Sequence, residues 1–348
     1  MKEIGIDLGS AYIMVSSADK DIVMREPSLM AVDRASGRIL KVGSEAQQHY
    51  LNNSDDSTML VVPFRDGIVS NCDATQRMLA HCLKLFGRGL TGSKVLLGVP
   101  CGMTRVEEGA LAEIAMQAGA RKCYLVYSAV AALIGCGYAG RGTRLIVDIG
   151  SRKTDIVLVS EGAVIYKYSL GVAGDAFDRS ISGYLADQHG IRIGPKTAEN
   201  IKLKIGTVWL ETERKFLDVK GRCINDKSST KTVRIYSDEM FEALEEPMAA
   251  IIEGICVAVS KIPSECVGEV LRSGILLTGG GSLLDGLPRL ITGVTGIDTA
   301  LAKNPKSAAI SGLVRIVGRV QGGYGPGDVN ISEKCLIALR NRETGRLD

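Results

Sequence analysis

The chain has 348 residues, 45% of them hydrophobic and 23% charged. This ordinary globular composition excludes a disordered chain and a coiled coil. At roughly 150 residues per domain, the length predicts two domains. A formal net charge of +3 and an aromatic content of 5% provide neither a basic surface nor a stacking platform, so we expect no nucleic-acid partner.

Cysteine and histidine residues follow no disulfide or metal-binding pattern. The nine cysteines are an odd number without a CxxC pair, and the three histidines are isolated. Charges at Lys2, Glu3 and Asp7 leave no apolar run for a secretory signal. We therefore expect a cytoplasmic location.

Strands and helices alternate along the chain, which is typical of an α/β fold. From the N-terminus, the pattern predicts a strand hairpin at 4–15, two strands around a Ser-Gly turn at 26–43, a helix at 74–86, a strand at 94–100, a helix at 106–120, a strand at 123–127 and a helix at 128–135. It continues with a second hairpin at 145–159, a helix at 197–205, short strands within 211–235 that turn at Gly221, a long helix at 238–262, a strand, glycine turn and helix at 274–290, and a loop from residue 321.

The stretch from Cys123 to Gly140 carries no charge over 18 residues, which is close to the length of a membrane span. It contains several glycines and divides naturally at Ser128. We interpret it as a buried strand followed by a buried helix, and expect no transmembrane helix.

The main sequence feature is a duplication of the two hairpins. Residues 4–15 read IGIDLGSAYIMV and residues 145–159 read LIVDIGSRKTDIVLV. Each is an apolar strand, an aspartate, an apolar residue, a glycine and a serine, then a second apolar strand. The matched pairs are Asp7 with Asp148, Gly9 with Gly150, and Ser10 with Ser151.

These residue types suit a phosphate-binding turn. A tight glycine-containing turn directs backbone N–H groups toward an anion, and the serines can add hydroxyl donors. An aspartate before each turn would repel phosphate, but it can hold the waters of a Mg²⁺ ion that neutralises the phosphates. Two such hairpins facing each other would bind the phosphates of a nucleotide from both sides.

A third glycine cluster, GILLTGGGSLLDGLPRL at residues 274–290, follows another apolar strand. Gly279, Gly280 and Gly281 would let a flat group approach the backbone closely, and the following residues open a helix. No Walker motif is present. By itself the cluster is equally consistent with a flexible turn.

Together the two hairpins and the glycine cluster resemble the actin and sugar-kinase ATPase superfamily, and within it the bacterial MreB family of actin-like rod-shape proteins. The resemblance runs from about residue 4 to residue 315 and includes DLGSA at 7–11, EPS at 26–28, DGIV at 66–69, VPCGMT at 99–104, AGAR at 118–121, VDIG at 147–150, AENIK at 198–202, EALEEP at 242–247 and LTGGGSLL at 277–284.

The resemblance implies two related α/β lobes with a nucleotide cleft between them. The first lobe would span 1–142 with a small insert at about 33–66. The second would span 143–315 with an insert at about 186–250. Residues 316–348 would hold the end of the fold and a C-terminal tail.

The resemblance also implies a site for ATP and Mg²⁺. Asp7 and Asp148 would order the water shell of the metal, and Thr154 would join them in catalysis. Nucleotide contacts would come from Gly9, Ser10, Ala11 and Tyr12; from Gly150, Ser151, Arg152 and Lys153; from Glu199, Asn200, Ile201 and Lys202; and from Gly279, Gly280, Gly281, Ser282 and Leu283.

The chain departs from the family pattern in two places. The second loop is glycine-rich and followed by threonines in the family but reads GSRKT here, which keeps only Gly150 and Thr154. Arg152 and Lys153 would either supply charge in place of backbone approach or be solvated. The family carries a glutamate that positions the attacking water, and Ser128 stands at that position. A serine is no base at neutral pH without an activating neighbour, so we expect weak ATPase activity at most.

The resemblance further implies contact with the inner face of the cell membrane. The matching loop here is LFGRGLTG at residues 85–92, in which Leu85, Phe86 and Leu90 lie near basic residues. The alternative is that Leu85 and Phe86 complete the core face of the preceding helix.

Three functions remain open from the sequence. The first is an ATP-binding filament protein that directs cell shape with cell-wall synthesis proteins as partners, although no short motif encodes polymerisation. The second is a hydrolysis-deficient nucleotide-binding adaptor of the same fold, which Ser128 and the GSRK loop favour. The third is a small-molecule kinase, for which no base outside the phosphate loops stands out.

Overall fold

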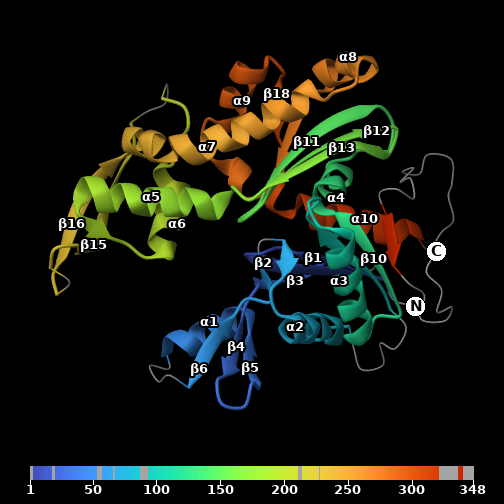
Figure 1. The fold of residues 1–348 in the computed structure, drawn as a ribbon, viewed down its shortest axis with the longest axis horizontal. Coiled ribbons are helices and arrows are strands. Elements are labelled where there is room, and N and C mark those ends of the chain that lie inside the picture. Colours follow the sequence, from blue (N-terminus) through green and yellow to red (C-terminus); the bar gives the residue numbers. More distant parts are fainter. Residues whose placement is uncertain are drawn as a thin grey trace. The chain divides into compact units, whose positions relative to one another are not determined.

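The computed structural model describes residues 3–17, 20–52, 57–65, 67–86, 93–210, 214–226, 228–320 and 336–339. The chain divides into two compact units (Figure 1). The first comprises residues 1–143, 157–169 and 306–348, and the second comprises residues 144–156 and 170–305. The expected α/β class is confirmed, since both units combine sheets with helices.

The first unit contains a six-stranded sheet in the order β19-β10-β9-β1-β2-β3. Its central strand β1 runs parallel to β9 and antiparallel to β2. Ile4 and Ile6 of β1 are fully buried, as a near-continuous apolar run predicts for a central strand. The strands are β1 (Glu3–Leu8), β2 (Tyr12–Ser17), β3 (Lys20–Pro27), β9 (Lys94–Val99), β10 (Lys122–Tyr127) and β19 (Leu336–Leu339).

Two amphipathic helices of the first unit begin at sequence-encoded caps. Asn71 accepts a hydrogen bond from the Ala74 backbone at the start of α2 (Cys72–Lys84). Thr104 and Glu107 form a capping box at the start of α3 (Arg105–Gln117). The predicted helix is confirmed, and Met78, Leu79, Cys82 and Leu83 of α2 are buried on one face.

A small subdomain follows β3 in the first unit. Its three-stranded sheet has the order β5-β4-β6, with α1 packed against it. The predicted turn between two strands in 26–43 is confirmed, because the Asp33 amide donates to the Arg38 carbonyl at 2.9 Å. The elements are β4 (Met30–Asp33), β5 (Ile39–Val42), α1 (Gly43–Asn52) and β6 (Thr58–Val61), followed by the strand pair β7 (Phe64–Arg65) and β8 (Ile68–Val69).

The uncharged stretch forms β10 followed by α4 (Ser128–Gly135), as expected. Helix α4 is buried because α10 (Ala308–Val320) packs closely on it. A Cβ atom at Gly312 would lie 1.7 Å from the Ala131 carbonyl oxygen, and one at Gly135 would lie 2.1 Å from the Ala308 carbonyl oxygen. This contact places residues 308–315 with the first unit, whereas the sequence assigned them to the second lobe.

The second repeated hairpin belongs to a five-stranded sheet in the order β13-β12-β11-β17-β18. Strand β11 runs parallel to β17, and the two strands place Asp148 opposite Thr278. The strands are β11 (Thr143–Ile149), β12 (Thr154–Ser160), β13 (Ala163–Leu170), β17 (Ile275–Thr278) and β18 (Thr299–Leu301).

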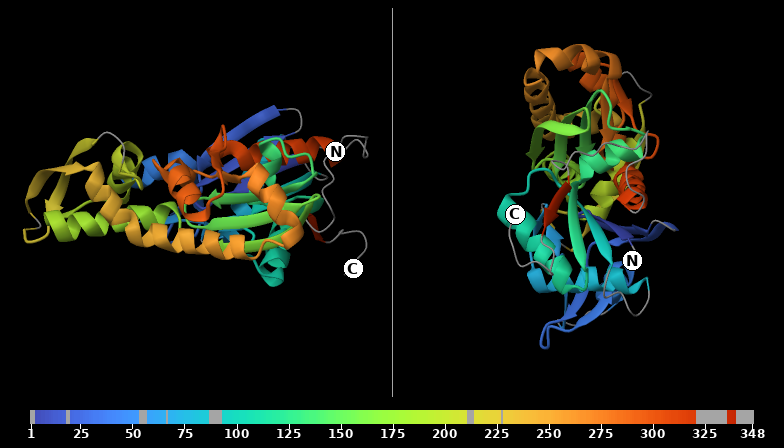
Figure 2. Two further views of the ribbon diagram at one scale, coloured as in Figure 1. Left: turned by 90° about the horizontal axis from the view of Figure 1, so that it is seen from above. Right: turned by 90° about the vertical axis from the view of Figure 1, so that its right-hand side faces the viewer.

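Helices α5 and α7 of the second unit lie side by side and lead to a three-stranded sheet in the order β14-β15-β16 (Figure 2). The elements are α5 (Gly174–His189), β14 (Ile191–Arg192), α6 (Pro195–Ile205), β15 (Phe216–Cys223), β16 (Thr230–Tyr236), α7 (Ser237–Ser260), α8 (Ser264–Ser273), the short η1 (Gly281–Leu283), α9 (Leu287–Thr295) and the short η2 (Pro305–Ser307).

The predicted turn at Gly221 is wrong. Gly221 lies within β15 and pairs with Lys231 of β16. A Cβ atom there would lie 2.9 Å from the Ile191 side chain and 3.0 Å from the Arg192 carbonyl oxygen, so the glycine permits close approach of β14. The turn lies instead at Asp226, whose carboxylate accepts hydrogen bonds from the Ser228 amide and hydroxyl.

Candidate functional site

The first repeated turn joins β1 to β2, and Ser28 holds two of its carbonyl groups. The Ser28 hydroxyl donates to the Gly9 carbonyl at 2.5 Å, and the Ser28 amide donates to the Ala11 carbonyl at 2.9 Å. Within the described part of the chain, the amides of Ser10 and Ala11 have no protein acceptor. The turn therefore has backbone donors available for an anion.

Glycine is required at the start of this turn. A Cβ atom at Gly9 would lie 2.5 Å from the Tyr12 carbonyl oxygen, a clash with rigid backbone. The Tyr12 side chain is 42% exposed and lies under the Arg25 guanidinium, 4.8 Å from the ring centroid. The predicted nucleotide contacts on this turn therefore lie together at one surface of the first unit.

Asp7, at the end of β1, meets Ser128 at the start of α4. The Ser128 hydroxyl donates to Asp7 Oδ1 at 3.2 Å. Gly98 of β9 leaves the space in which they meet, because its Cβ atom would lie 2.9 Å from Asp7 Oδ1 and 3.0 Å from Ser128 Oγ. Burial raises the pKa of Asp7 to about 6, and the Ser128 hydrogen bond opposes this shift.

The second repeated turn joins β11 to β12, and the first residues of α5 support it. The Gly150 amide donates to the Lys153 carbonyl at 2.9 Å and closes the turn. The Gly174 amide donates to the Gly150 carbonyl at 3.2 Å, and the Asp175 amide donates to the Ser151 carbonyl at 2.6 Å. The α5 N–H groups thus bind the turn itself, as Ser28 does in the first unit.

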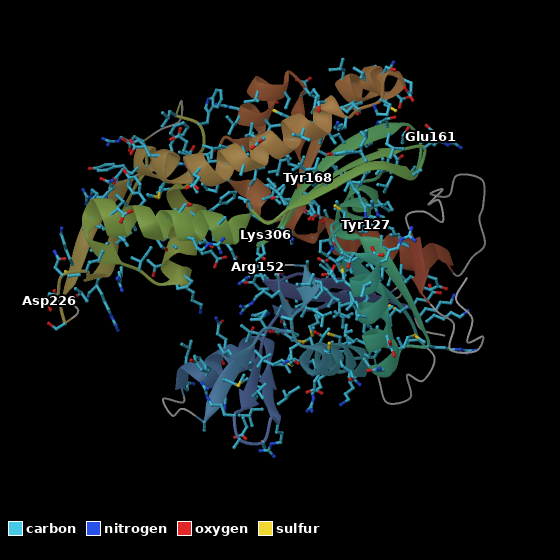
Figure 3. The ribbon with its side chains drawn as sticks, in the orientation of Figure 1. Tyr127, Arg152, Glu161, Tyr168, Asp226 and Lys306 are labelled. Atoms are coloured by element: carbon cyan, nitrogen blue, oxygen red, sulfur yellow. The ribbon has the colours of Figure 1, made fainter. Side chains whose placement is uncertain are left out.

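Arg152 projects from the second turn (Figure 3). Its Nε atom lies 2.9 Å from Asp175 Oδ2, and the two side chains are 27% and 33% exposed. The neighbouring Lys153 has no carboxylate in ion-pair range among the residues that are described. The turn therefore carries two cations, Arg152 and Lys153.

Thr154 has a structural contact. Its side chain is fully buried, and its hydroxyl donates to the Val172 carbonyl at 2.7 Å. This hydrogen bond ties β12 to the segment that leads into α5. The catalytic role that the resemblance gives Thr154 finds no support in this placement.

Asp148 is held by a hydroxyl group, as Asp7 is in the first unit. Thr278 at the end of β17 donates its hydroxyl to Asp148 Oδ1 at 2.9 Å. The following Gly279 has a φ of 82°, and a Cβ atom there would lie 2.2 Å from the Ile149 carbonyl oxygen. A Cβ atom at Gly281 would lie 2.4 Å from the Ile149 side chain. The glycine cluster therefore packs on the end of β11.

Only part of the glycine segment is open to a ligand. Ser282 is 1% exposed and donates its hydroxyl to the Gly279 carbonyl at 2.7 Å. Gly279 is partly exposed, Gly280 is exposed, and Leu283 is 42% exposed. Leu283 is therefore the side chain of this segment that can pack on an adenosine.

The four α6 positions separate into exposed and buried residues. Glu199 and Asn200 are exposed, whereas Ile201 is fully buried in the core. The Lys202 ammonium lies 2.8 Å from Asp178 Oδ1 and donates to the Gly174 carbonyl at 3.2 Å. Burial raises the pKa of Asp178, and Lys202 opposes this. Lys202 thus contacts α5.

The sequence pattern gives no separate role to three residues that bond the two turns or the side chains on them. Ser28 lies within the EPS motif and Thr278 within the glycine motif. The groups that accept hydrogen bonds from their hydroxyls are distant in the sequence, so the motifs do not reveal them. Asp175 lies 23 positions after Arg152 and carries no motif. A polar residue directly before a glycine run was the available signal for Thr278.

The expected membrane loop is described only in part. Leu85 is 43% exposed, and Phe86 is partly buried after the end of α2. Leu90 lies outside the described residues. None of the helices in the described ranges is long and apolar enough to span a bilayer.

A magnesium nucleotide suits the donor groups of these turns. The free amides of Ser10 and Ala11 and the cations Arg152 and Lys153 match phosphate oxygens. In the described ranges no three His, Cys, Asp or Glu side chains form a complete metal site. A cation beside Asp7 or Asp148 would take its other ligands from water and phosphate, as Mg²⁺ commonly does.

The chain matches known proteins over almost its whole length. A family model described as MreB/Mbl protein matches residues 1–322. The cell shape-determining protein Mbl of Bacillus subtilis (strain 168) is 33% identical over 316 residues, which cover 89% of this chain and 94% of Mbl. The cell shape-determining protein MreB of Escherichia coli (strain K12) is 34% identical over 319 residues, which cover 89% of this chain and 91% of MreB.

A solved structure confirms the expected fold. MreB5 of Spiroplasma citri bound to ADP superposes with a TM-score of 0.85 at 27% identity, covering 92% of this chain and 99% of that chain. The fold is therefore that of the actin-like ATPases. With two hydroxyl-held aspartates beside two repeated turns, and with these matches, this chain belongs to the MreB/Mbl family.

Proposed function

We propose that this chain binds ATP with Mg²⁺ and assembles into filaments that direct cell shape and cell-wall synthesis. Its family membership supports this, because the matching relatives are cell shape-determining proteins and MreB5 is seen with ADP. The observation that carries the proposal is the pair of turns with Asp7 and Asp148, each held by a hydroxyl group.

Both turns would contribute donor groups to nucleotide binding, and the second turn would add a cation. Backbone amides and serine hydroxyls at Ser10 and Ser151 donate to phosphate oxygens, and Arg152 adds positive charge. Asp7 and Asp148 would hold the water shell of a bound Mg²⁺. The ion would neutralise phosphate charge and so would allow carboxylates beside an anionic ligand.

Hydrolysis in this proposal is slow. Ser128 donates its hydroxyl to Asp7, so it stabilises the carboxylate and is not arranged to accept a proton from water. Loss of a water-positioning carboxylate costs orders of magnitude in rate. Filament assembly would then depend on nucleotide occupancy, with turnover having little part.

Filament growth requires head-to-tail contacts that repeat without closing. We place these filaments at the inner face of the cell membrane through Leu85, Phe86 and Leu90. Cell-wall synthesis proteins would be the further partners.

High-speed sedimentation tests the proposal. Purified protein is centrifuged without nucleotide, with Mg-ATP and with Mg-AMPPNP. We expect pelleting only with nucleotide, and equally with both, because binding suffices for assembly. Protein that remains in the supernatant in all three samples, yet still binds nucleotide, would instead identify the hydrolysis-deficient adaptor.

A pair of glycine variants serves as the control. Gly9→Ala introduces the clash with the Tyr12 carbonyl and should abolish nucleotide-dependent pelleting. Gly109→Ala in α3 meets no atom within 4 Å and should pellet as the wild type does. Equal pelleting of both variants would contradict the assignment of the first turn.

A further inference from the structure

The ion pair between Arg152 and Asp175 lies on the second phosphate turn itself. Arg152 Nε lies 2.9 Å from Asp175 Oδ2. An arginine on a phosphate-binding turn is a ready ligand for phosphate, because its planar N–H groups match phosphate and carboxylate oxygens equally well. The same guanidinium thus has a carboxylate partner before any phosphate arrives.

The two members of the pair are anchored differently. The Asp175 amide donates to the Ser151 carbonyl at 2.6 Å, and its carboxylate lies in the first turn of α5, where the helix dipole favours negative charge. Arg152 instead extends from the turn on a long side chain that is 27% exposed. Arg152 is therefore the member that can change partner while Asp175 stays in place.

The nearby Lys202–Asp178 ion pair is less able to exchange a partner with phosphate than the Arg152–Asp175 pair. Lys202 is bound to Asp178 at 2.8 Å and also to the Gly174 carbonyl. Those two side chains are 13% and 19% exposed, so they are more shielded than the Arg152 pair. A phosphate that reaches the turn therefore competes with the Asp175 carboxylate for the Arg152 guanidinium.

We propose that Asp175 is a built-in competitor for nucleotide phosphate, and that a bound phosphate takes Arg152 from it. Asp175 is then a positioning residue that orients Arg152 and limits nucleotide affinity. The inference rests on the proposed nucleotide binding and adds the regulation of that site. It requires no hydrolysis, so it is independent of the role of Ser128.

A double-mutant cycle measured by isothermal titration tests it. The wild type, Arg152→Met, Asp175→Asn and the double variant are each titrated with Mg-AMPPNP and Mg-ADP. Arg152→Met should weaken binding about tenfold or more, because a charge-assisted hydrogen bond is lost. Asp175→Asn should tighten binding about two- to fivefold, the strength of a partly exposed ion pair.

The inference is decided by whether the effect of Asp175→Asn on nucleotide affinity depends on the presence of Arg152. In the Arg152→Met background, Asp175→Asn should no longer tighten binding, because no guanidinium remains to be released. A merely structural role for Asp175 would weaken binding in both backgrounds. Either that result, or tightening that persists without Arg152, overturns the inference.

Arg214 and Asp238 form the matched control. Asp238 also lies in the first turn of a helix, α7, and bonds Arg214 at 2.8 Å in the same unit. Asp238→Asn should leave nucleotide affinity unchanged. Wild-type protein that binds neither nucleotide would overturn the proposed function together with this inference, whereas binding without coupling overturns the inference alone.

Discussion

At the scale of single residues, a hydroxyl group holds the aspartate before each repeated turn. Ser128 binds Asp7 in the first unit, and Thr278 binds Asp148 in the second. The two donors come from unlike elements, the start of a helix and the end of a strand. The shared requirement is a fixed carboxylate at the end of a buried strand, where an unpaired charge would be costly.

Replacing Asp7 with asparagine should stabilise the metal-free protein. The pKa of Asp7 is raised from 3.8 to about 6, so its ionisation opposes folding and stability falls as pH rises through this range. At pH 7.5 in EDTA, Asp7→Asn should raise the free energy of unfolding by up to about 3 kcal/mol. Denaturation midpoints measured at several pH values should show the difference shrinking as pH falls through about 6 and vanishing only below the unfolded pKa of 3.8.

Asp33 provides the opposite control. Hydrogen bonds from Ser36 lower the pKa of this carboxyl group, so its ionised form stabilises the native state. Asp33→Asn should therefore destabilise at neutral pH. A stability gain in Asp7→Asn that did not change with pH would contradict the explanation by burial.

At the scale of elements, neighbouring segments hold both turns by their carbonyl groups. Ser28, just after β3, holds the first turn, and the start of α5 holds the second. Because the turn carbonyls accept hydrogen bonds from these segments, amides such as those of Ser10 and Ala11 remain available to a ligand. The turn carbonyls are thus bonded mainly by the Ser28 side chain in the first unit and by the N-terminal amides of α5 in the second.

The contact between α4 and α10 should tolerate no side chain at Gly312. Gly312→Ala places a Cβ atom 1.7 Å from the Ala131 carbonyl oxygen, so the helices must separate. We expect the free energy of unfolding to fall by about 1–3 kcal/mol or more. Urea denaturation measures this.

The helical glycine of α3 gives the comparison. Gly109→Ala has no neighbour within 4 Å and should gain up to about 1 kcal/mol from higher helix propensity. Equal effects of the two substitutions would show that helix propensity, and not the close contact, determines the Gly312 result.

At the scale of the whole molecule, the proposed contact with the membrane depends on apolar side chains at the surface. Leu85 is 43% exposed after α2, and Leu90 belongs to the same sequence stretch, LFGRGLTG at 85–92. On the proposed membrane contact, Leu85→Ser with Leu90→Ser should reduce flotation with vesicles containing anionic lipid about tenfold, because the apolar contribution of both leucines is removed.

Leu51 is the control for this measurement. It is 70% exposed in the first unit, outside the basic loop, so Leu51→Ser should float as the wild type does. Flotation lost equally in both variants, or retained in the double variant, would contradict membrane contact through the loop.

The sequence predicted the repeated turns, the α/β class and most helices, because local patterns determine them. A glycine before a tight turn, a capping box and an apolar face are visible within a dozen residues. The duplicated DxG pattern likewise predicted Asp7 and Asp148 as counterparts, and the structure gives them matching hydroxyl partners.

Contacts between distant segments could not be read in this way. Gly221 resembled a turn but accommodates β14, and Ile201 fell in a binding motif but lies in the core. Asp175 lies 23 positions after Arg152 in the sequence, and only the fold brings the two side chains together. Sequence alone determined which backbone conformations each segment prefers. Only the tertiary structure decided which donors meet which acceptors, because those partners come together through burial of the core.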